Sequence, residues 1–296
     1  MFDPELLKRF RYLCWTAQRA RGRGLLAPRE TRWSAGTAAI GLRDYAPGDD
    51  YRQIDWTVCA RRDELLTRVV ATDVDRDVYV LLDCSRSMGT GRPAKFQLAR
   101  RIAAVLGYAA LTEGARLNVV AFADGIVAEL PAVRHENRVP KLLRFLDQLE
   151  LQGERTDLTR AADVFVRRCQ RHGPTVVIGD LLDPDGFQRG FDVLRGRGYD
   201  VRLVQIHDPH EADPQLLGDV ELVDVEARTG RRATVTERAV QRYRALYAEF
   251  QTSVGRYCSR HGITRVPVAC DATEEAVLLG VLGVKQQETR MSNLRA

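Results

Sequence analysis

The 296-residue chain has no cysteine pair with the C-x-x-C spacing of a zinc or redox site. Its six cysteines stand far apart, and we expect them to be free thiols in a reducing compartment. The five histidines show no ligand spacing either, and His207-Asp-Pro-His210 is expected to form a turn rather than to bind a metal. The chain is long enough to bury a large core without disulfides.

Long hydrophobic runs are also missing. The longest apolar-rich segment, Ile102 to Leu111, is far shorter than the roughly 20 residues that a helix needs to cross a bilayer. The N-terminal stretch MFDPELLKRFRYLCW is charged early and has no apolar core of the signal-peptide kind. We therefore expect a cytoplasmic protein without a membrane span.

Two catalytic loop motifs are absent as well. No segment matches G-x-x-x-x-G-K-[ST], so the chain has no P-loop for a nucleotide. No segment matches G-x-S-x-G either, which excludes the nucleophile elbow of an α/β-hydrolase.

Positive charge is concentrated at the N-terminus. The formal net charge is +5, and residues 1–32 hold eight basic and three acidic side chains, so the remainder is balanced. The spacing of Leu6, Phe10, Leu13 and Ala17 predicts a helix over residues 4–21. Its basic face is either simply solvated or a surface for nucleic-acid phosphates or an acidic partner.

From Arg76 onward, apolar strands alternate with amphipathic helices. Strands are predicted within residues 77–83, 116–124, 126–130, 175–183, 199–207 and 263–270, and a hairpin around Thr229-Gly230. Helices are predicted over residues 95–112, 138–150, 157–171, 185–196, 236–260 and 273–283. Unbroken apolar strands in such an alternation predict an α/β fold, a doubly wound, mostly parallel sheet with helices on both faces.

The helix predicted over residues 236–260 has a regular apolar stripe. We expect its buried face to carry six side chains, namely Val240, Tyr243, Tyr247, Phe250, Val254 and Tyr257. Residues 28–75 differ, since they are turn-rich with short β-like runs at 37–42 and 65–73. The sequence therefore suggests two parts: residues 1–74, with a basic helix and a β/turn-rich segment, and residues 75–296, the α/β domain.

Polar side chains follow the first predicted strand at every second position. Asp83, Ser85 and Ser87 occupy the loop that leaves it, in the stretch LLDCSRSM. Ligand sites in open α/β sheets lie at the carboxyl ends of strands, and oxygen-only side chains suit a hard cation such as Mg²⁺. A plain capping loop ahead of the next helix is the alternative, because Ser and Asp are good caps. Cys84 is expected to point the other way and to pack in the core.

Candidate ligands recur on neighbouring loops. Thr156 stands just before a predicted helix in GERTDLT, and Asp180 ends a buried strand in VVIGDLLD. The set D-x-S-x-S, then Thr, then Asp resembles the metal-ion-dependent adhesion site of von Willebrand factor A domains. The resemblance implies that Ser85, Ser87 and Thr156 contact the ion, whereas Asp83 and Asp180 act partly through water. Thr159 competes with Thr156, and Asp183 competes with Asp180.

The segment upstream of the first strand carries a longer motif. It reads Arg43-x-Tyr45, Pro47-Gly48-Asp49-Asp50, Arg52-x-Ile54-Asp55-Trp56 and Ala60-Arg61. This pattern resembles the signature of bacterial "domain of unknown function 58" proteins, and the resemblance extends over residues 33–285. Its acidic and basic side chains are expected either to cross-link the loop or to form a docking surface, and Trp56 is expected to anchor a core.

The resemblance implies a non-enzymatic accessory partner of a MoxR-type AAA+ ATPase. We expect a Mg²⁺ ion, or another divalent cation, to bind weakly, with a dissociation constant on the order of 0.1–1 mM, because the ligand charge is low. The bound ion would accept a carboxylate from the ATPase or from another protein, and no nucleic acid is expected. Two rival hypotheses are a metal-dependent phosphohydrolase that uses Asp83 and Asp180, and a nucleic-acid binder that uses the basic helix.

Overall fold

The computed structural model describes residues 7–14, 41–44, 59, 66–69, 76–153, 155–183, 185–223, 230–273, 276–277 and 281. The chain divides into two compact units, Arg29–Arg76 and the rest of the chain. In the smaller unit, β1 (Gly41–Asp44) pairs antiparallel with β2 (Leu66–Val69), as the short β-like runs predicted. The signature over residues 45–61, including Trp56, lies outside the described residues except for Cys59.

The larger unit is built on a six-stranded sheet with the order β10-β7-β6-β3-β4-β5. Its strands are β3 (Asp77–Asp83), β4 (Arg116–Phe122), β5 (Ile126–Val133), β6 (Pro174–Gly179), β7 (Asp200–His207) and β10 (Thr264–Ala269). All neighbours pair parallel except β5, which runs antiparallel to β4. The predicted fold class, a mostly parallel α/β sheet with helices on both faces, is confirmed.

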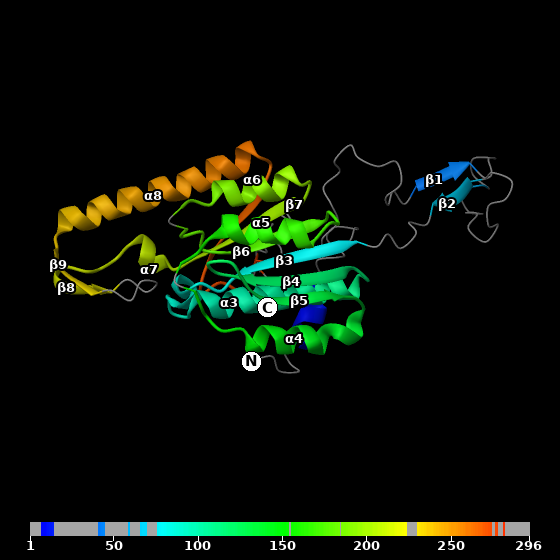
Figure 1. The fold of residues 1–296 in the computed structure, drawn as a ribbon, viewed down its shortest axis with the longest axis horizontal. Helices are drawn as coiled ribbons and strands as arrows, with labels where there is room; N and C mark the ends of the chain where they lie inside the picture. Colours follow the sequence, from blue (N-terminus) through cyan, green and yellow to red (C-terminus); the bar gives the residue numbers. More distant parts are fainter. Residues whose placement is uncertain are drawn as a thin grey trace, which may run out of the picture. The chain divides into compact units, whose positions relative to one another are not determined.

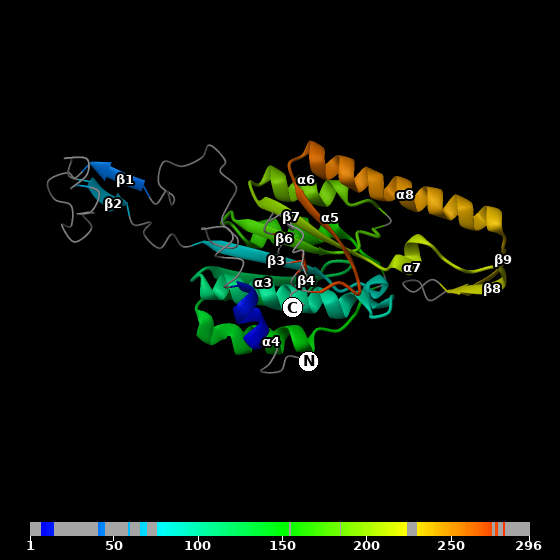
Figure 2. The same cartoon turned by 180° about the vertical axis from the view of Figure 1, so that it is seen from behind.

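Helices cover both faces of this sheet, as Figures 1 and 2 show. One face packs against α3 (Lys95–Thr112) and α4 (Val139–Gln148), and the other against α5 (Leu158–Arg168), α6 (Gln188–Gly196) and α8 (Glu237–Arg260). Strand β3 divides its side chains between the two cores by simple alternation: Val80 and Leu82 face α3, whereas Tyr79 and Leu81 face α5. A strand buried on both sides requires the unbroken apolar run seen in its sequence.

At β3 the chain changes the side of the sheet edge to which it adds successive strands. From β3 the chain crosses through α3 to β4 on one side, whereas β6 and then β7 lie on the other side. The carboxyl ends of β3 and β6 therefore flank a topological switch point, where α/β sheets bind ligands. Asp83 is the last residue of β3, and Asp180 directly follows β6.

The N-terminal helix belongs to the larger unit. Residues 7–14 are helical, and Phe10, Leu13 and Cys14 are buried in the same core as α3. The ring of Phe10 lies 6.4 Å from that of Tyr108 on α3. The sequence analysis grouped this helix with residues 29–74, whereas in the described structure its apolar stripe packs in the α/β core. The remaining residues of the predicted 4–21 helix lie outside the described residues.

The predicted buried face of α8 is only partly correct in its N-terminal half. Val240 and Val254 are buried, and Phe250 and Tyr257 are partly buried against the core, but Tyr243 is 42% exposed. Figure 1 shows the reason: this half of α8 extends past the sheet to α7 (Pro209–Ala212), β8 (Gly218–Val223) and β9 (Gly230–Val235). The hairpin predicted here is confirmed, since β8 pairs antiparallel with β9. Of the helix predicted over 273–283, positions 276, 277 and 281 are described and helical, whereas position 273 is described and not helical.

Candidate functional site

Asp83 is held at the end of β3 by its own loop. Its side chain is buried, and Oδ1 accepts a hydrogen bond of 2.8 Å from the Ser85 amide. The end of β6 lies close beside it, because a Cβ on Gly179 would approach Oδ2 of Asp83 to 2.9 Å. A residue larger than glycine at position 179 would therefore displace the Asp83 carboxylate.

The two serine hydroxyls meet directly. Ser85 Oγ lies 3.0 Å from Ser87 Oγ, and Ser85 is fully buried. Neither serine caps a helix through its hydroxyl: Ser85 precedes η2 (Arg86–Gly89) without a side-chain cap, and the N-cap of α3 is Ala94. Neither hydroxyl therefore serves as a helix cap, in contrast to the capping interpretation of this loop.

The loop that carries Thr156 lies against the Asp83 loop. The Gln152 amide donates to the carbonyl of Cys84 at 2.9 Å, and the Asp157 amide donates to the carbonyl of Ala123 at 2.8 Å. Thr156 itself is 2% exposed, whereas its competitor Thr159 is partly exposed within α5. The structure thus places Thr156 in a buried position on a loop bonded to the first one.

Asp180 sits where the backbone turns sharply after β6. Its Oδ1 accepts from the Leu182 amide at 3.0 Å, and Leu181 between them adopts a left-handed conformation with φ of 62°. Asp180 is 3% exposed. Its competitor Asp183 has a different task, because its carboxylate accepts from the backbone amides of Leu158 and Asp185 and so fixes the start of α5. Burial is the main cause that raises the pKa of the Asp183 carboxyl group.

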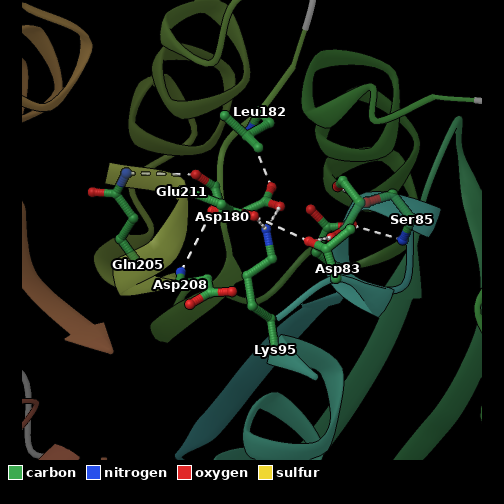
Figure 3. A network of polar contacts seen from close by, with 10 residues as sticks. Asp83, Ser85, Lys95, Asp180, Leu182, Gln205, Asp208 and Glu211 are labelled. Carbon is green, nitrogen blue, oxygen red and sulfur yellow. Dashed lines mark hydrogen bonds and ion pairs between the residues drawn. The ribbon is translucent and has the colours of Figure 1, made fainter. Parts of the chain in front are cut away.

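A lysine that the sequence analysis did not single out completes the site, as Figure 3 shows. Lys95, the first residue of α3, is fully buried, and its ammonium lies 2.8 Å from Asp180 Oδ2 and 2.6 Å from Glu211 Oε1. Burial alone would lower the pKa of Lys95, but the two carboxylates outweigh it, and the pKa is raised. The two carboxylates therefore favour the charged form of Lys95.

Glu211 reaches this lysine from the short helix after β7. Its Oε1 also accepts from the Thr90 hydroxyl at 3.0 Å, and it forms a capping box with Asp208 at the start of α7. The prediction of a plain turn at residues 207–210 therefore misses the start of α7, the helix that carries Glu211. The available signal was Asp208 followed three residues later by Glu211, a capping-box pattern.

Cys84 points away from the site, as alternation predicts. It is fully buried in the apolar core on the α3 side, and its thiol donates weakly to the carbonyl of Leu82. Burial raises the pKa of this thiol. A buried protonated thiol is a poor nucleophile.

We expect Cys84 to resist thiol reagents until the domain unfolds. Replacing Cys84 by Ala should leave metal and partner binding unchanged, because the side chain contributes only packing. Mass spectrometry after alkylation in native buffer and in denaturant measures this. Rapid native modification of Cys84, or loss of binding in the alanine variant, would show that the thiol reaches the site after all.

The donor set fits a small hard cation in one respect and is constrained in another. Adjacent ligands of an octahedral Mg²⁺ ion stand about 2.9 Å apart, as 2.0–2.1 Å bonds require. The Ser85 and Ser87 hydroxyls, 3.0 Å apart, match that spacing. Asp180, in contrast, already faces an ammonium. No group of three or more His, Cys, Asp or Glu side chains suited to a metal occurs in the described part of the chain, so the predicted set relies on hydroxyls.

A comparison with protein-family models matches most of the chain to one family. The family model described as "Protein of unknown function DUF58" matches residues 41–288. An uncharacterized protein of Mycobacterium tuberculosis is 29% identical over 198 residues, which cover 65% of this chain and 62% of that protein. The chain thus spans less than two thirds of the length of this curated relative.

Solved structures with a similar arrangement share little sequence with the chain. The conserved hypothetical protein BatB from Bacteroides thetaiotaomicron is 16% identical, with a TM-score of 0.45, covering 71% of this chain and 98% of that chain. The SpRpn10 VWA domain is 10% identical, with a TM-score of 0.40, covering 70% and 94%. Likenesses at this level transfer neither a ligand nor a partner. No helix among the described residues is long and apolar enough to cross a membrane.

Proposed function

We propose that this chain, which belongs to the DUF58 family of proteins of unknown function, is a non-enzymatic protein-interaction module. Its binding site is the carboxyl edge of the sheet at the switch point between β3 and β6. Asp83, Ser85, Ser87, Thr156 and Asp180 form an adhesion-type site there. A divalent cation, Mg²⁺ in the first place, would supply an exchangeable coordination position that an Asp or Glu of a partner protein can fill.

One observation carries this proposal. The hydroxyls of Ser85 and Ser87 are paired at 3.0 Å beside a buried carboxylate, and neither caps a helix through its side chain. Buried polar groups normally serve a structural hydrogen bond to the backbone or a ligand. Here the paired hydroxyls bond to one another, at the edge where α/β sheets bind ligands.

The partner is proposed to be a MoxR-type AAA+ ATPase. Support comes from the resemblance of residues 43–61 to the family signature, and from the absence of a P-loop in the sequence, so that any nucleotide-driven work needs a second protein. The pair would act together in the cytoplasm to remodel or mature client proteins. The partner's carboxylate would bind at the adhesion-type site only while the ion is present.

Calorimetry with Mg²⁺ tests the metal part of the proposal. We expect one weak site, with a dissociation constant on the order of 0.1–1 mM, because two carboxylates and three hydroxyls give little ligand charge. Binding should be lost in the Ser85→Ala variant, whose missing hydroxyl would otherwise contact the ion. The Ser259→Ala variant is a matched control, because Ser259 is exposed on α8.

Undiminished Mg²⁺ binding in Ser85→Ala would place the ion elsewhere and contradict the assignment. Hydrolysis of a phosphate ester by the wild-type chain, dependent on Mg²⁺ and lost in Asp83→Asn, would favour the phosphohydrolase hypothesis instead.

A further inference from the structure

The candidate metal site already contains a cation of its own. The Lys95 ammonium is fully buried between Asp180 Oδ2, at 2.8 Å, and Glu211 Oε1, at 2.6 Å (Figure 3). A lysine at the first position of a helix is opposed by the helix dipole. Burial of a charge is strongly unfavourable unless the charge is paired. The two carboxylates that face the ammonium offset this cost.

The ammonium is fixed by more than one element. Glu211, from α7, accepts from both Lys95 and the Thr90 hydroxyl, and the Thr90 hydroxyl also lies 2.7 Å from the Ser87 carbonyl. Asp180, from the end of β6, is held in turn by the Leu182 amide. Both carboxylates are thus held by further hydrogen bonds, and they keep the ammonium beside Asp180.

We infer that Lys95 is a resident cation that shares Asp180 with the divalent ion and thereby keeps the metal affinity of the free protein low. The inference rests on the proposed function. An ion bound through Asp180 would meet a carboxylate whose charge is partly neutralised, and it would be repelled by the nearby ammonium. In a buried site solvent screens neither effect strongly.

A second consequence concerns the site without an ion. Because Lys95 balances Asp180, the carboxyl edge stays assembled when no divalent ion is bound. Mg²⁺ should then add little to the stability of the wild-type protein, since a weak ligand stabilises only slightly. Without the ammonium, the carboxylates would need another cation, and stability would become dependent on the ion.

The test compares Lys95→Met with Lys141→Met, a control that removes a lysine exposed on α4. Calorimetry with Mg²⁺ should show at least roughly tenfold tighter binding in Lys95→Met and wild-type affinity in the control. The thermal midpoint of Lys95→Met should rise by several degrees from EDTA to millimolar Mg²⁺, whereas that of wild type and of the control should hardly move.

The outcomes separate the inference from the proposed function. If Lys95→Met binds Mg²⁺ no more tightly than wild type, while Ser85→Ala still abolishes binding, the inference is wrong and the metal site stands. If neither the wild-type chain nor Lys95→Met binds Mg²⁺, the inference and the proposed metal site are both wrong.

A second variant keeps the test decisive should Lys95→Met not fold. Glu211→Gln preserves the acceptor oxygen for Lys95 and Thr90 but removes one negative charge, so the ammonium acts on Asp180 with less compensation. We expect this variant to bind Mg²⁺ several-fold more weakly than wild type. Unchanged affinity in Glu211→Gln would overturn the inference.

Discussion

Alanine at both Ser85 and Ser87 is expected to weaken Mg²⁺-dependent binding of the proposed ATPase partner by about a hundredfold or more, which corresponds to at least ~2.7 kcal/mol. The two hydroxyls would hold the ion, and without the ion the partner's carboxylate would have no metal to coordinate. The thermal midpoint should hardly change. The hydroxyls bond to one another at 3.0 Å, and removal of both partners of a hydrogen bond together is nearly neutral.

The measurement is the affinity of the proposed MoxR-type ATPase partner for wild-type and double-variant chains at constant Mg²⁺ and nucleotide. EDTA alone is a poor test, because it also strips the metal that an ATPase needs for its nucleotide. The double variant removes the hydroxyls and leaves the nucleotide complex intact. Ser253→Ala/Ser259→Ala, two hydroxyl deletions on α8, is the matched control and should bind as wild type does.

If the partner binds the serine double variant as tightly as the wild-type chain, and salt weakens this binding, the partner must use another surface. Lys8, Arg9 and Arg11 are exposed on the N-terminal helix, whose apolar side is buried in the core. Binding through such a face depends on charge and weakens as ionic strength rises. If moderate salt dissolves the complex while Ser85→Ala/Ser87→Ala leaves it unchanged, the adhesion-site mechanism is wrong for this protein.

The sequence predicted the sheet well because its strands are buried on both faces. Runs such as residues 77–83 and 174–179 have no polar face to place, so their apolar continuity identifies them directly. Asp83, Ser85 and Asp180 could be located for the same reason: a polar side chain that ends an apolar run stands at the carboxyl edge of the sheet. Whether they bind a cation remains a prediction.

Lys95 and Glu211 were missed because their relation is not local. Lys95 pairs with residues 85 and 116 positions away along the chain. In the sequence, a lysine at the start of an amphipathic helix looks like an ordinary surface charge. Only the strand order, which brings α7 next to the start of α3, turns it into a buried cation.

The exposed half of α8 illustrates a different limit. Its apolar stripe has regular helical spacing, and the helix is present as predicted. Periodicity shows which residues share a face, but not whether anything packs against that face. Tyr243 lies on the stripe and is nevertheless exposed, because the helix continues past the sheet.

Asp180→Ala is expected to lower the free energy of unfolding by about 3–5 kcal/mol, in contrast to the serine variants. The substitution leaves the buried Lys95 ammonium with one carboxylate instead of two, and it removes the acceptor of the Leu182 amide beside the left-handed Leu181. Breaking one half of a buried ion pair is costly because the remaining charge stays desolvated. Urea denaturation followed by circular dichroism measures the loss.

Asp180→Asn separates charge from shape in this prediction. The amide oxygen can still accept from the Leu182 amide, so the turn after β6 is kept, while the neutral side chain no longer balances Lys95. We expect a loss of unfolding free energy that is smaller than in Asp180→Ala, and loss of Mg²⁺ binding in both variants.

Asp183→Ala is the control variant, since that carboxylate fixes the start of α5 and does not contact Lys95 in the described structure. A wild-type unfolding free energy in Asp180→Ala would mean that the ammonium does not depend on Asp180. In that case the serine half and the aspartate half of the site would both be dispensable for folding, and Lys95 would have to be stabilised by Glu211 alone.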